Sequence, residues 1–379
     1  MLASQATFHA AATGDVDLTR DAPSSGAYTG VDAMGLFWSR SPQPASELPL
    51  SVQCADDPMT IALVAESESA EPITHSIRRR YCDDSVTARK VREAGLAGTL
   101  FEPRASGRHP AVLVVGGSGG GVRWSEEMAA LLASHGYVAL ALAYFGMEGL
   151  PPTLDRIPLE YFGKAIAWLA QQDKVERNRI AVSGASRGGE LALLLGATFP
   201  AIRAVVAYVA SGIVWPAYPP SGHSAWTLDG KDVPHADVMP LEEWNLAVSQ
   251  GRVDPDSFDW YFIPLQDSAV VEAASIRVEN INGPVLLISG QDDRIWPSAG
   301  LTEFALARFK RKGFNHPVEH LSYADAGHSL GWPHVSTMST RFKHPVSGED
   351  QDLGGSPAGT ARAREESWRR MLAFLRDSL

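Results

Sequence analysis

Cysteine, positive charge and long apolar segments are all scarce in this sequence. Cys54 and Cys82 are the two cysteines, too few for a disulfide framework and wrongly spaced for a C-x-x-C metal site. We therefore expect buried free thiols in a reducing compartment, the cytoplasm. Residues 1–12 hold no Lys or Arg, which argues against a secretory signal peptide. No run of about 18 uncharged apolar residues occurs, so no membrane span is expected.

The charge balance is acidic, with 44 Asp and Glu against 33 Lys and Arg and a net charge of −11. Such a balance argues against nucleic acid as a general partner. The hydrophobic content of 45% and charged content of 20% are ordinary for a soluble globular protein. A chain of 379 residues has room for one large α/β domain and a smaller one.

Apolar runs alternate with segments of helical spacing from about residue 97 onward. The run 111–115 lies between Pro110 and Gly116, as a strand buried on both faces would. This alternation predicts a doubly wound, mostly parallel sheet, the α/β class. We expect further strands at 137–142, 179–183, 204–209, 284–289 and 318–323, and helices at 124–135, 159–172, 189–196 and 361–378.

Residues 1–95 differ from the rest, since they are polar and carry only short apolar alternations, at 48–52 and 59–64. These predict a small β-rich N-terminal region of antiparallel strands before a catalytic domain over 96–379. An aromatic-rich insertion at 214–265 interrupts the alternation, and we interpret it as a lid over the active site. A second, polar insertion covers 331–358.

A G-x-S-x-G motif at 184–188 follows an apolar run and opens a helical segment. A strand that turns sharply into a helix through this motif is a nucleophile elbow, and it would expose the hydroxyl of Ser186. A second match surrounds Ser118 with glycines, which suits a cradle of backbone amides better than a rigid elbow. The glycine loop does not match a nucleotide-binding motif. The P-loop motif G-x-x-x-x-G-K-[ST] needs a Lys that is absent, and the dinucleotide motif G-x-G-x-x-G needs a glycine where Val122 stands.

A serine nucleophile needs a base and an acid that orients it, in the chain order Ser, Asp or Glu, His for this fold class. Asp293 follows the strand at 284–289 and His328 follows the strand at 318–323. We predict Asp293 as the orienting acid, with its neighbour Asp292 as the alternative. The oxyanion hole would use the amide of Arg187 and one from the glycine loop, at Gly117 or Ser118. No cofactor and no metal are expected.

The chain resembles the acyl-CoA thioesterase and bile acid-CoA:amino acid N-acyltransferase family, within the α/β-hydrolase superfamily and its dienelactone-hydrolase-like members. The resemblance covers residues 97–379 and is weaker upstream, where 14–18 and 31–38 look like the second half of the family's N-terminal β-sandwich. It therefore implies a truncated sandwich. The features that carry it are the glycine loop at 116–122, the strand end at 141–145 with Leu150-Pro151, the Ser186 elbow, the Asp293 and His328 loops, and the tail at 354–358 with Ser367-Trp368.

This resemblance implies a function as well as a fold. Its hydrolases use serine and its bile-acid conjugating enzymes use cysteine, so Ser186 favours hydrolysis of an acyl thioester through an acyl-serine. A carboxylic ester hydrolase of the dienelactone type, and an acyltransferase to an amine or alcohol, remain as alternatives. The expected partner is a small-molecule acyl thioester or ester. A homo-oligomer is possible, because half a sandwich leaves open sheet edges.

Overall fold

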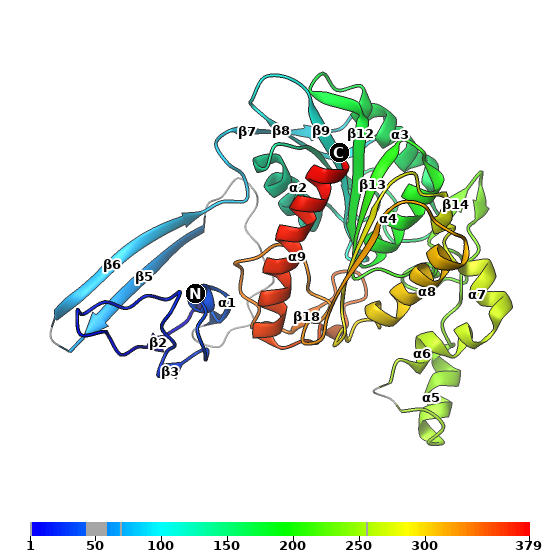
Figure 1. Cartoon of the computed structure of the whole chain (residues 1–379). Coiled ribbons are helices and arrows are strands. Elements are labelled where there is room, and N and C mark those ends of the chain that lie inside the picture. Colours follow the sequence, from blue (N-terminus) through cyan, green and yellow to red (C-terminus); the bar gives the residue numbers. More distant parts are fainter. Residues whose placement is uncertain (1, 43–58, 69, 255–256) are drawn as a thin grey trace.

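The computed structural model describes residues 2–42, 59–68, 70–254 and 257–379 (Figure 1). An eight-stranded sheet forms its centre, in the order β17-β16-β13-β12-β9-β10-β8-β7. Neighbouring strands from β17 to β10 are parallel, and β8 runs antiparallel to both β10 and β7. The mostly parallel sheet predicted from the sequence is confirmed. Its strands are β7 (Val86–Val91), β8 (Ala97–Pro103), β9 (His109–Val115), β10 (Val138–Ala143), β12 (Val175–Ala185), β13 (Ile202–Tyr208), β16 (Val285–Gly290) and β17 (Val318–Tyr323).

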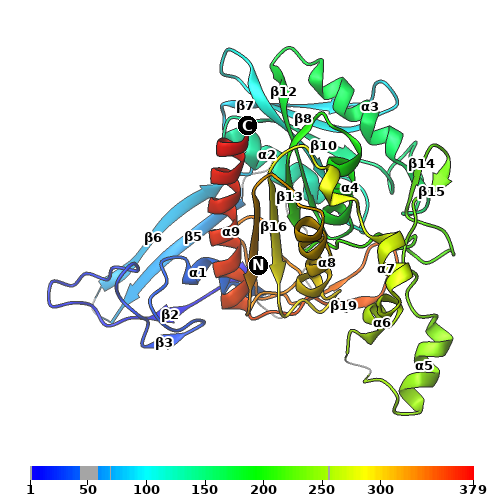
Figure 2. The same cartoon turned by 45° about the vertical axis from the view of Figure 1, so that its right-hand side comes forward.

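Helices cover both faces of the sheet because successive side chains of each strand point to opposite sides. On β9, Val112 and Val114 pack on one face, whereas Leu113 and Val115 pack on the other. Full burial of each such side chain stabilises the fold by about 1.5–3 kcal/mol. The first face carries α2 (Arg123–Ser134) and α9 (Pro357–Ser378), and the second carries α3 (Leu159–Ala170), α4 (Arg187–Thr198) and α8 (Ser298–Arg311) (Figure 2).

Local sequence sets where these helices begin and end. The turn after α2 has Gly136 in the left-handed region at φ 93°, and the Tyr137 amide returns to the Leu132 carbonyl at 3.2 Å. That pairing is a Schellman motif, which glycine favours because it has no Cβ. At the start of α9, the Ser356 hydroxyl accepts a bond from the Gly359 amide at 3.0 Å. None of the helices in the described part of the chain has the length and apolar character that a bilayer-crossing segment needs.

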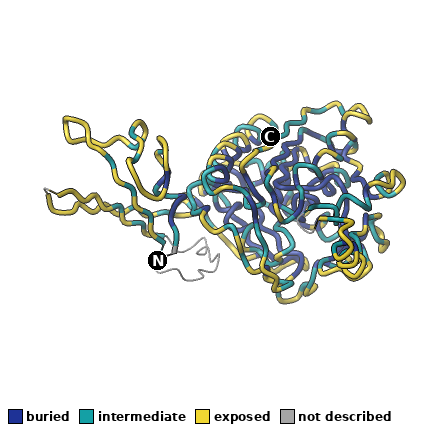
Figure 3. The backbone as a smooth tube through the Cα atoms, turned by 90° about the horizontal axis from the view of Figure 1, so that it is seen from below, coloured by how far each residue is buried: buried dark blue, intermediate teal, exposed yellow. Residues whose placement is uncertain are grey.

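The N-terminal region extends away from the sheet and is largely exposed (Figure 3). The strand β7 precedes the boundary predicted at residue 95, yet it is part of the central sheet. Val86 and Val91 are buried, and β7 pairs with β8 as the edge strand. The division into domains and the truncated sandwich stay predictions. The predicted strand at 48–52 and Cys54 lie outside the described residues. The other elements here are β1 (Leu2–Ala3) paired with β4 (Ser41–Pro42), β2 (Ala6–Thr7) with β3 (Ser25–Gly26), β5 (Met59–Ser67) with β6 (Ala70–Arg79), and α1 (Gly35–Trp38).

The aromatic-rich insertion has a buried root and an exposed end. Trp215 and Trp226 are 1% and 0% exposed, so both belong to the core, whereas Leu241 and Leu246 of α5 are exposed on the projecting part (Figures 1 and 2). Its role as a lid stays a prediction. Within the insertion lie β14 (Trp226–Leu228), β15 (Lys231–Asp232), α5 (Leu241–Ser249) and α6 (Asp259–Phe262). The elements next to it are η1 (Pro264–Gln266), which spans its end, α7 (Ser268–Ala274), η2 (Val278–Asn280), and β11 (Ile157–Pro158), which pairs with β14. The second insertion holds the antiparallel pair β18 (Arg341–Lys343) and β19 (Asp350–Asp352).

The buried acid Glu127 should make the free energy of unfolding depend on pH. Burial raises the pKa of Glu127, on α2, from 4.5 to about 8; Arg123 lowers it and Glu126 raises it. Because the folded state binds this proton more tightly, the stabilisation is present below pH 4.5 and is lost as pH rises through about 8. The unfolding free energy of the wild type should therefore fall relative to Glu127→Gln by up to about 1.4 kcal/mol per pH unit in that window.

Urea unfolding of both proteins at several pH values measures this difference. The exposed Glu148→Gln is the matched control, and its difference from the wild type should stay flat. A flat difference for Glu127→Gln as well would contradict the assignment.

Candidate active site

Ser186 lies at the sharp turn between β12 and α4, with φ 60° and ψ −125°. This is an unusual conformation for a residue with a side chain, and it costs on the order of 1–3 kcal/mol. The surrounding backbone maintains it, because the Ser186 amide donates to the Tyr208 carbonyl at 2.9 Å and its carbonyl accepts from Gly189 and Glu190 at 2.8 and 3.0 Å. The motif at 184–188 therefore forms the strand–turn–helix that the sequence predicts.

Glycines around the turn allow three stretches of backbone to meet. A Cβ at Gly184 would overlap the carbonyl oxygen of Gly188, and a Cβ at Gly188 would overlap that of Gly116. The end of β9 thus packs directly on the first turn of α4. Gly117, next along the glycine loop, lies against the turn, since a Cβ there would be 3.1 Å from the Ser186 Cβ. The loop predicted as an amide cradle is in contact with the turn that carries Ser186.

His328 and Asp293 form a hydrogen bond of 2.8 Å between Nδ1 and Oδ2. Asp293 is 1% exposed, and its other oxygen accepts from the amides of Ile295 and Trp296 at 3.0 and 3.3 Å. The neighbouring carboxylate of Asp292 binds other groups. It accepts a hydrogen bond from the Gly355 amide at 2.9 Å and lies 3.1 Å from Arg294. Of the two candidate acids, the structure brings Asp293 to the imidazole.

The loop that carries His328 is fixed by segments further along the chain. The His328 amide donates to the Leu353 carbonyl at 2.7 Å. Arg364 of α9 donates from Nε to the Ser329 carbonyl at 2.6 Å and forms a second bond to the Ser329 hydroxyl. Burial lowers the pKa of Arg364 to about 10, and Tyr81 opposes this shift. No local motif marks Arg364, so sequence reasoning missed it.

All three predicted catalytic residues follow carboxyl ends of parallel strands, at one edge of the sheet. Ser186 follows β12, Asp293 follows β16 and His328 follows β17. The hydrogen bonds within the described residues do not include one between the Ser186 hydroxyl and His328; such catalytic bonds often tighten only when substrate is bound. Arg187 is the first residue of α4, so its amide has no acceptor within the helix. The Ser118 hydroxyl lies 3.1 Å from His344, a residue that the sequence did not single out.

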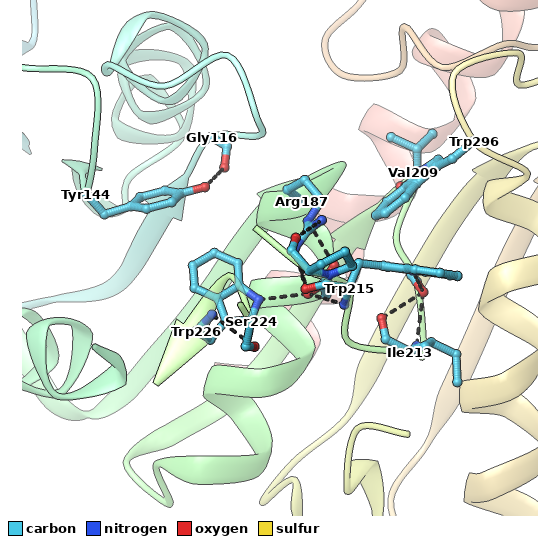
Figure 4. A network of polar contacts seen from close by, with 12 residues as sticks. Gly116, Tyr144, Arg187, Val209, Ile213, Trp215, Ser224, Trp226 and Trp296 are labelled. Atoms are coloured by element: carbon cyan, nitrogen blue, oxygen red, sulfur yellow. Dashed lines mark hydrogen bonds and ion pairs between the residues drawn. The ribbon is translucent and has the colours of Figure 1, made fainter. Parts of the chain in front are cut away.

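The side chain of Arg187 anchors the elbow to the root of the aromatic insertion (Figure 4). It donates to the carbonyls of Trp215 and Pro216 at 3.0 Å each, and its Nε lies 3.0 Å from the carboxylate of Glu190. Glu190 also accepts from the Trp226 indole at 2.7 Å and the Trp215 amide at 3.3 Å. Burial raises the pKa of Glu190, and the charge of Arg187 and the two tryptophan donors oppose that rise. This buried ion pair fixes the residue whose amide is the first predicted oxyanion donor.

Two family models match the chain. The one described as BAAT / Acyl-CoA thioester hydrolase C terminal matches residues 157–379, and the one described as Acyl-CoA thioester hydrolase/BAAT N-terminal region matches residues 1–93. The chain belongs to the acyl-CoA thioester hydrolase/BAAT family. The resemblance stated from the sequence is therefore confirmed, and it extends to the N-terminal region.

Members of this family are similar to the chain over most of their length. Mouse acyl-coenzyme A thioesterase 1 is 28% identical over 99% of the chain and 86% of its own length. Mouse bile acid-CoA:amino acid N-acyltransferase is 27% identical over 100% and 88%. The acylaminoacyl peptidase of Pyrococcus horikoshii is 14% identical, with a TM-score of 0.50 over 86% of this chain and 49% of that one, which shows the α/β-hydrolase fold alone. The cytoplasmic location stays a prediction.

Removing the charge of Glu190 should destabilise the protein strongly. Glu190→Gln leaves the buried Arg187 without its counter-charge, so we expect a loss of about 3–5 kcal/mol in unfolding free energy. Urea unfolding followed by tryptophan fluorescence measures this. The matched control is Glu176→Gln, which removes a half-exposed ion pair with Arg179 and should cost at most about 1 kcal/mol. Equal, small losses in both variants would contradict the role given to the buried pair.

Proposed function

We propose that this protein is a serine hydrolase that cleaves acyl thioesters of the acyl-CoA type through an acyl-Ser186 intermediate. The observation that carries the proposal is the 2.8 Å bond between His328 and the buried Asp293, at the sheet edge where the strained Ser186 also lies. Membership of the acyl-CoA thioester hydrolase/BAAT family supports the substrate class.

The proposed reaction begins with proton transfer from Ser186 to His328. Because Nδ1 of His328 faces the Asp293 carboxylate, that nitrogen carries the proton and Nε2 is left as the base. The serine oxygen attacks the thioester carbonyl, and the imidazolium then gives its proton to the departing thiol. Asp293 stabilises the charged imidazole. Water repeats the sequence on the acyl-serine and releases the acid.

Negative charge on the acyl oxygen would be stabilised by backbone amides. Arg187 supplies one amide, at the N-terminus of α4, and the glycine loop supplies the other at Gly117 or Ser118. Each such donor contributes about 3 kcal/mol of barrier reduction. The close packing of Gly188 on Gly116 supports this proposal, because it keeps the two donor segments in register.

Acyl transfer is the second candidate, favoured by the 27% identity to mouse bile acid-CoA:amino acid N-acyltransferase. We propose hydrolysis in preference because residue 186 is serine. An acyl-serine is an oxygen ester, which activated water clears, whereas an acyl-cysteine is a thioester better suited to attack by an amine. The resemblance associates cysteine, and not serine, with conjugation. A dienelactone-type ester hydrolase would use the same three residues, so only its substrate distinguishes it.

The two adjacent aspartates allow a matched test of the triad. Asp293→Asn should lower kcat by about 10³–10⁴-fold, because the imidazole loses the partner that fixes its tautomer and stabilises its charge. Ser186→Ala should abolish turnover. Asp292→Asn, one residue away, should change kcat by less than about tenfold. Steady-state kinetics on an acyl-CoA measures all three. Equal losses in the two aspartate variants, or turnover by Ser186→Ala, would refute the mechanism.

Substrate class is tested by comparing acyl-CoA with p-nitrophenyl esters of the same acyl chains. We expect kcat/KM to be higher for the thioester, and free acid to be the product even when an amino acid such as glycine is present. A preference for the ester by orders of magnitude at matched chain length would rule out the thioesterase assignment. Formation of an amide with the added amino acid would identify a transferase.

A further inference from the structure

The second insertion contacts the glycine loop. Its β18–β19 hairpin, residues 341–352, lies at the lower end of the central sheet in Figures 1 and 2. His344, between the two strands, is 3% exposed and has Nε2 3.1 Å from the hydroxyl of Ser118. Pro345 follows it, with Cγ 3.2 Å from where a Cβ on Gly119 would be. The loop thus contacts the Ser186 elbow on one side and this hairpin on the other.

The neighbours of His344 determine which of its nitrogens carries the proton. The backbone amides of Val346 and Ser347 point at Nδ1 from 3.2 and 3.3 Å, and an amide can only donate. Nδ1 is therefore an acceptor without a proton, and Nε2–H donates to Ser118. Burial lowers the pKa of His344, with Glu349 opposing and His328 adding to the shift, which favours this neutral form.

A hydroxyl has one proton to donate and two lone pairs. Because the Ser118 oxygen accepts the bond from His344, its own proton is left for another acceptor. The adjacent residue, Gly117, lies against the nucleophile, since a Cβ there would be 3.6 Å from the Ser186 Oγ.

We propose that the Ser118 hydroxyl, oriented by His344, donates a hydrogen bond to the acyl oxygen of the bound substrate as negative charge develops on it. The proton stays on Ser118 throughout. This inference rests on the proposed function and adds a side-chain donor to the backbone amides of the oxyanion hole. Ser118 is then a catalytic residue, and His344 is a positioning residue that acts through it.

Tyr218 joins the two insertions at this point. Its ring packs edge-on against His344 at a centroid distance of 5.0 Å, and its hydroxyl accepts from Gln351 of β19 at 3.4 Å. The imidazole is therefore held from the Tyr218 side as well as by its own turn. This contact gives the hairpin a function in positioning a donor.

The test compares Ser118→Ala with Ser118→Thr, which keeps the hydroxyl. Ser118→Ala should lower kcat on acyl-CoA by about 10²-fold at nearly constant KM, the loss seen when one oxyanion donor is removed. Its affinity for an alkyl trifluoromethyl ketone, which adds to the serine as a tetrahedral adduct, should fall in proportion. Ser118→Thr should stay within about fivefold of the wild type in both measurements. Ser118→Gly, which matches its glycine neighbours, replaces the alanine variant if the latter fails to fold.

His344→Leu tests the positioning role. It should lower kcat less than Ser118→Ala does, and the double variant should be no slower than Ser118→Ala alone, because His344 acts only through that hydroxyl. If the losses in kcat of the two single variants multiplied in the double variant, His344 would act independently of Ser118 and the positioning role would be wrong. Wild-type kcat and ketone affinity in Ser118→Ala, with Ser186→Ala inactive, would overturn the inference and leave the proposed function standing. Activity in Ser186→Ala would overturn the proposed function itself.

Discussion

The site depends on the contact between the backbones of β9 and α4, where Gly116 and Gly188 touch without any side chain between them. This contact fixes the distance between the glycine loop and the turn that carries Ser186. The two proposed oxyanion donors, one on the loop and one at the start of α4, need a constant distance if they are to bind one oxygen. The strained backbone conformation of Ser186 persists because the packing of the surrounding strands and of α4 determines the course of the turn.

A buried ion pair and the tryptophans around it stabilise the first turn of α4, which makes this contact. The Arg187–Glu190 pair is buried, so its attraction must offset a large loss of hydration, and two tryptophan N–H groups donate to the Oε1 atom of Glu190. One consequence is that the root of the aromatic insertion is part of the core. Its outer end, α5, exposes Leu241 and Leu246, so the two parts of one insertion differ in how deeply they are buried.

The sequence predicts the central strands of the sheet well because they are buried on both faces and appear as continuous apolar runs, as at 111–115. It predicts the elbow because the glycine positions are local. It cannot separate Asp292 from Asp293, since adjacent residues on a loop point in directions that only folding determines. It also missed His344 and Arg364. Their partners, Ser118 and Ser329, lie 226 and 35 residues away along the chain. No sequence motif surrounds His344 or Arg364 that would have indicated these contacts.

The position of Arg364 on α9 affects the order in which the site is assembled during synthesis. Ser186 is translated long before α9, a helix of 22 residues, yet the loop that carries His328 acquires its support from Arg364 only once that helix has been made and has docked. The elbow therefore precedes the support of its predicted base.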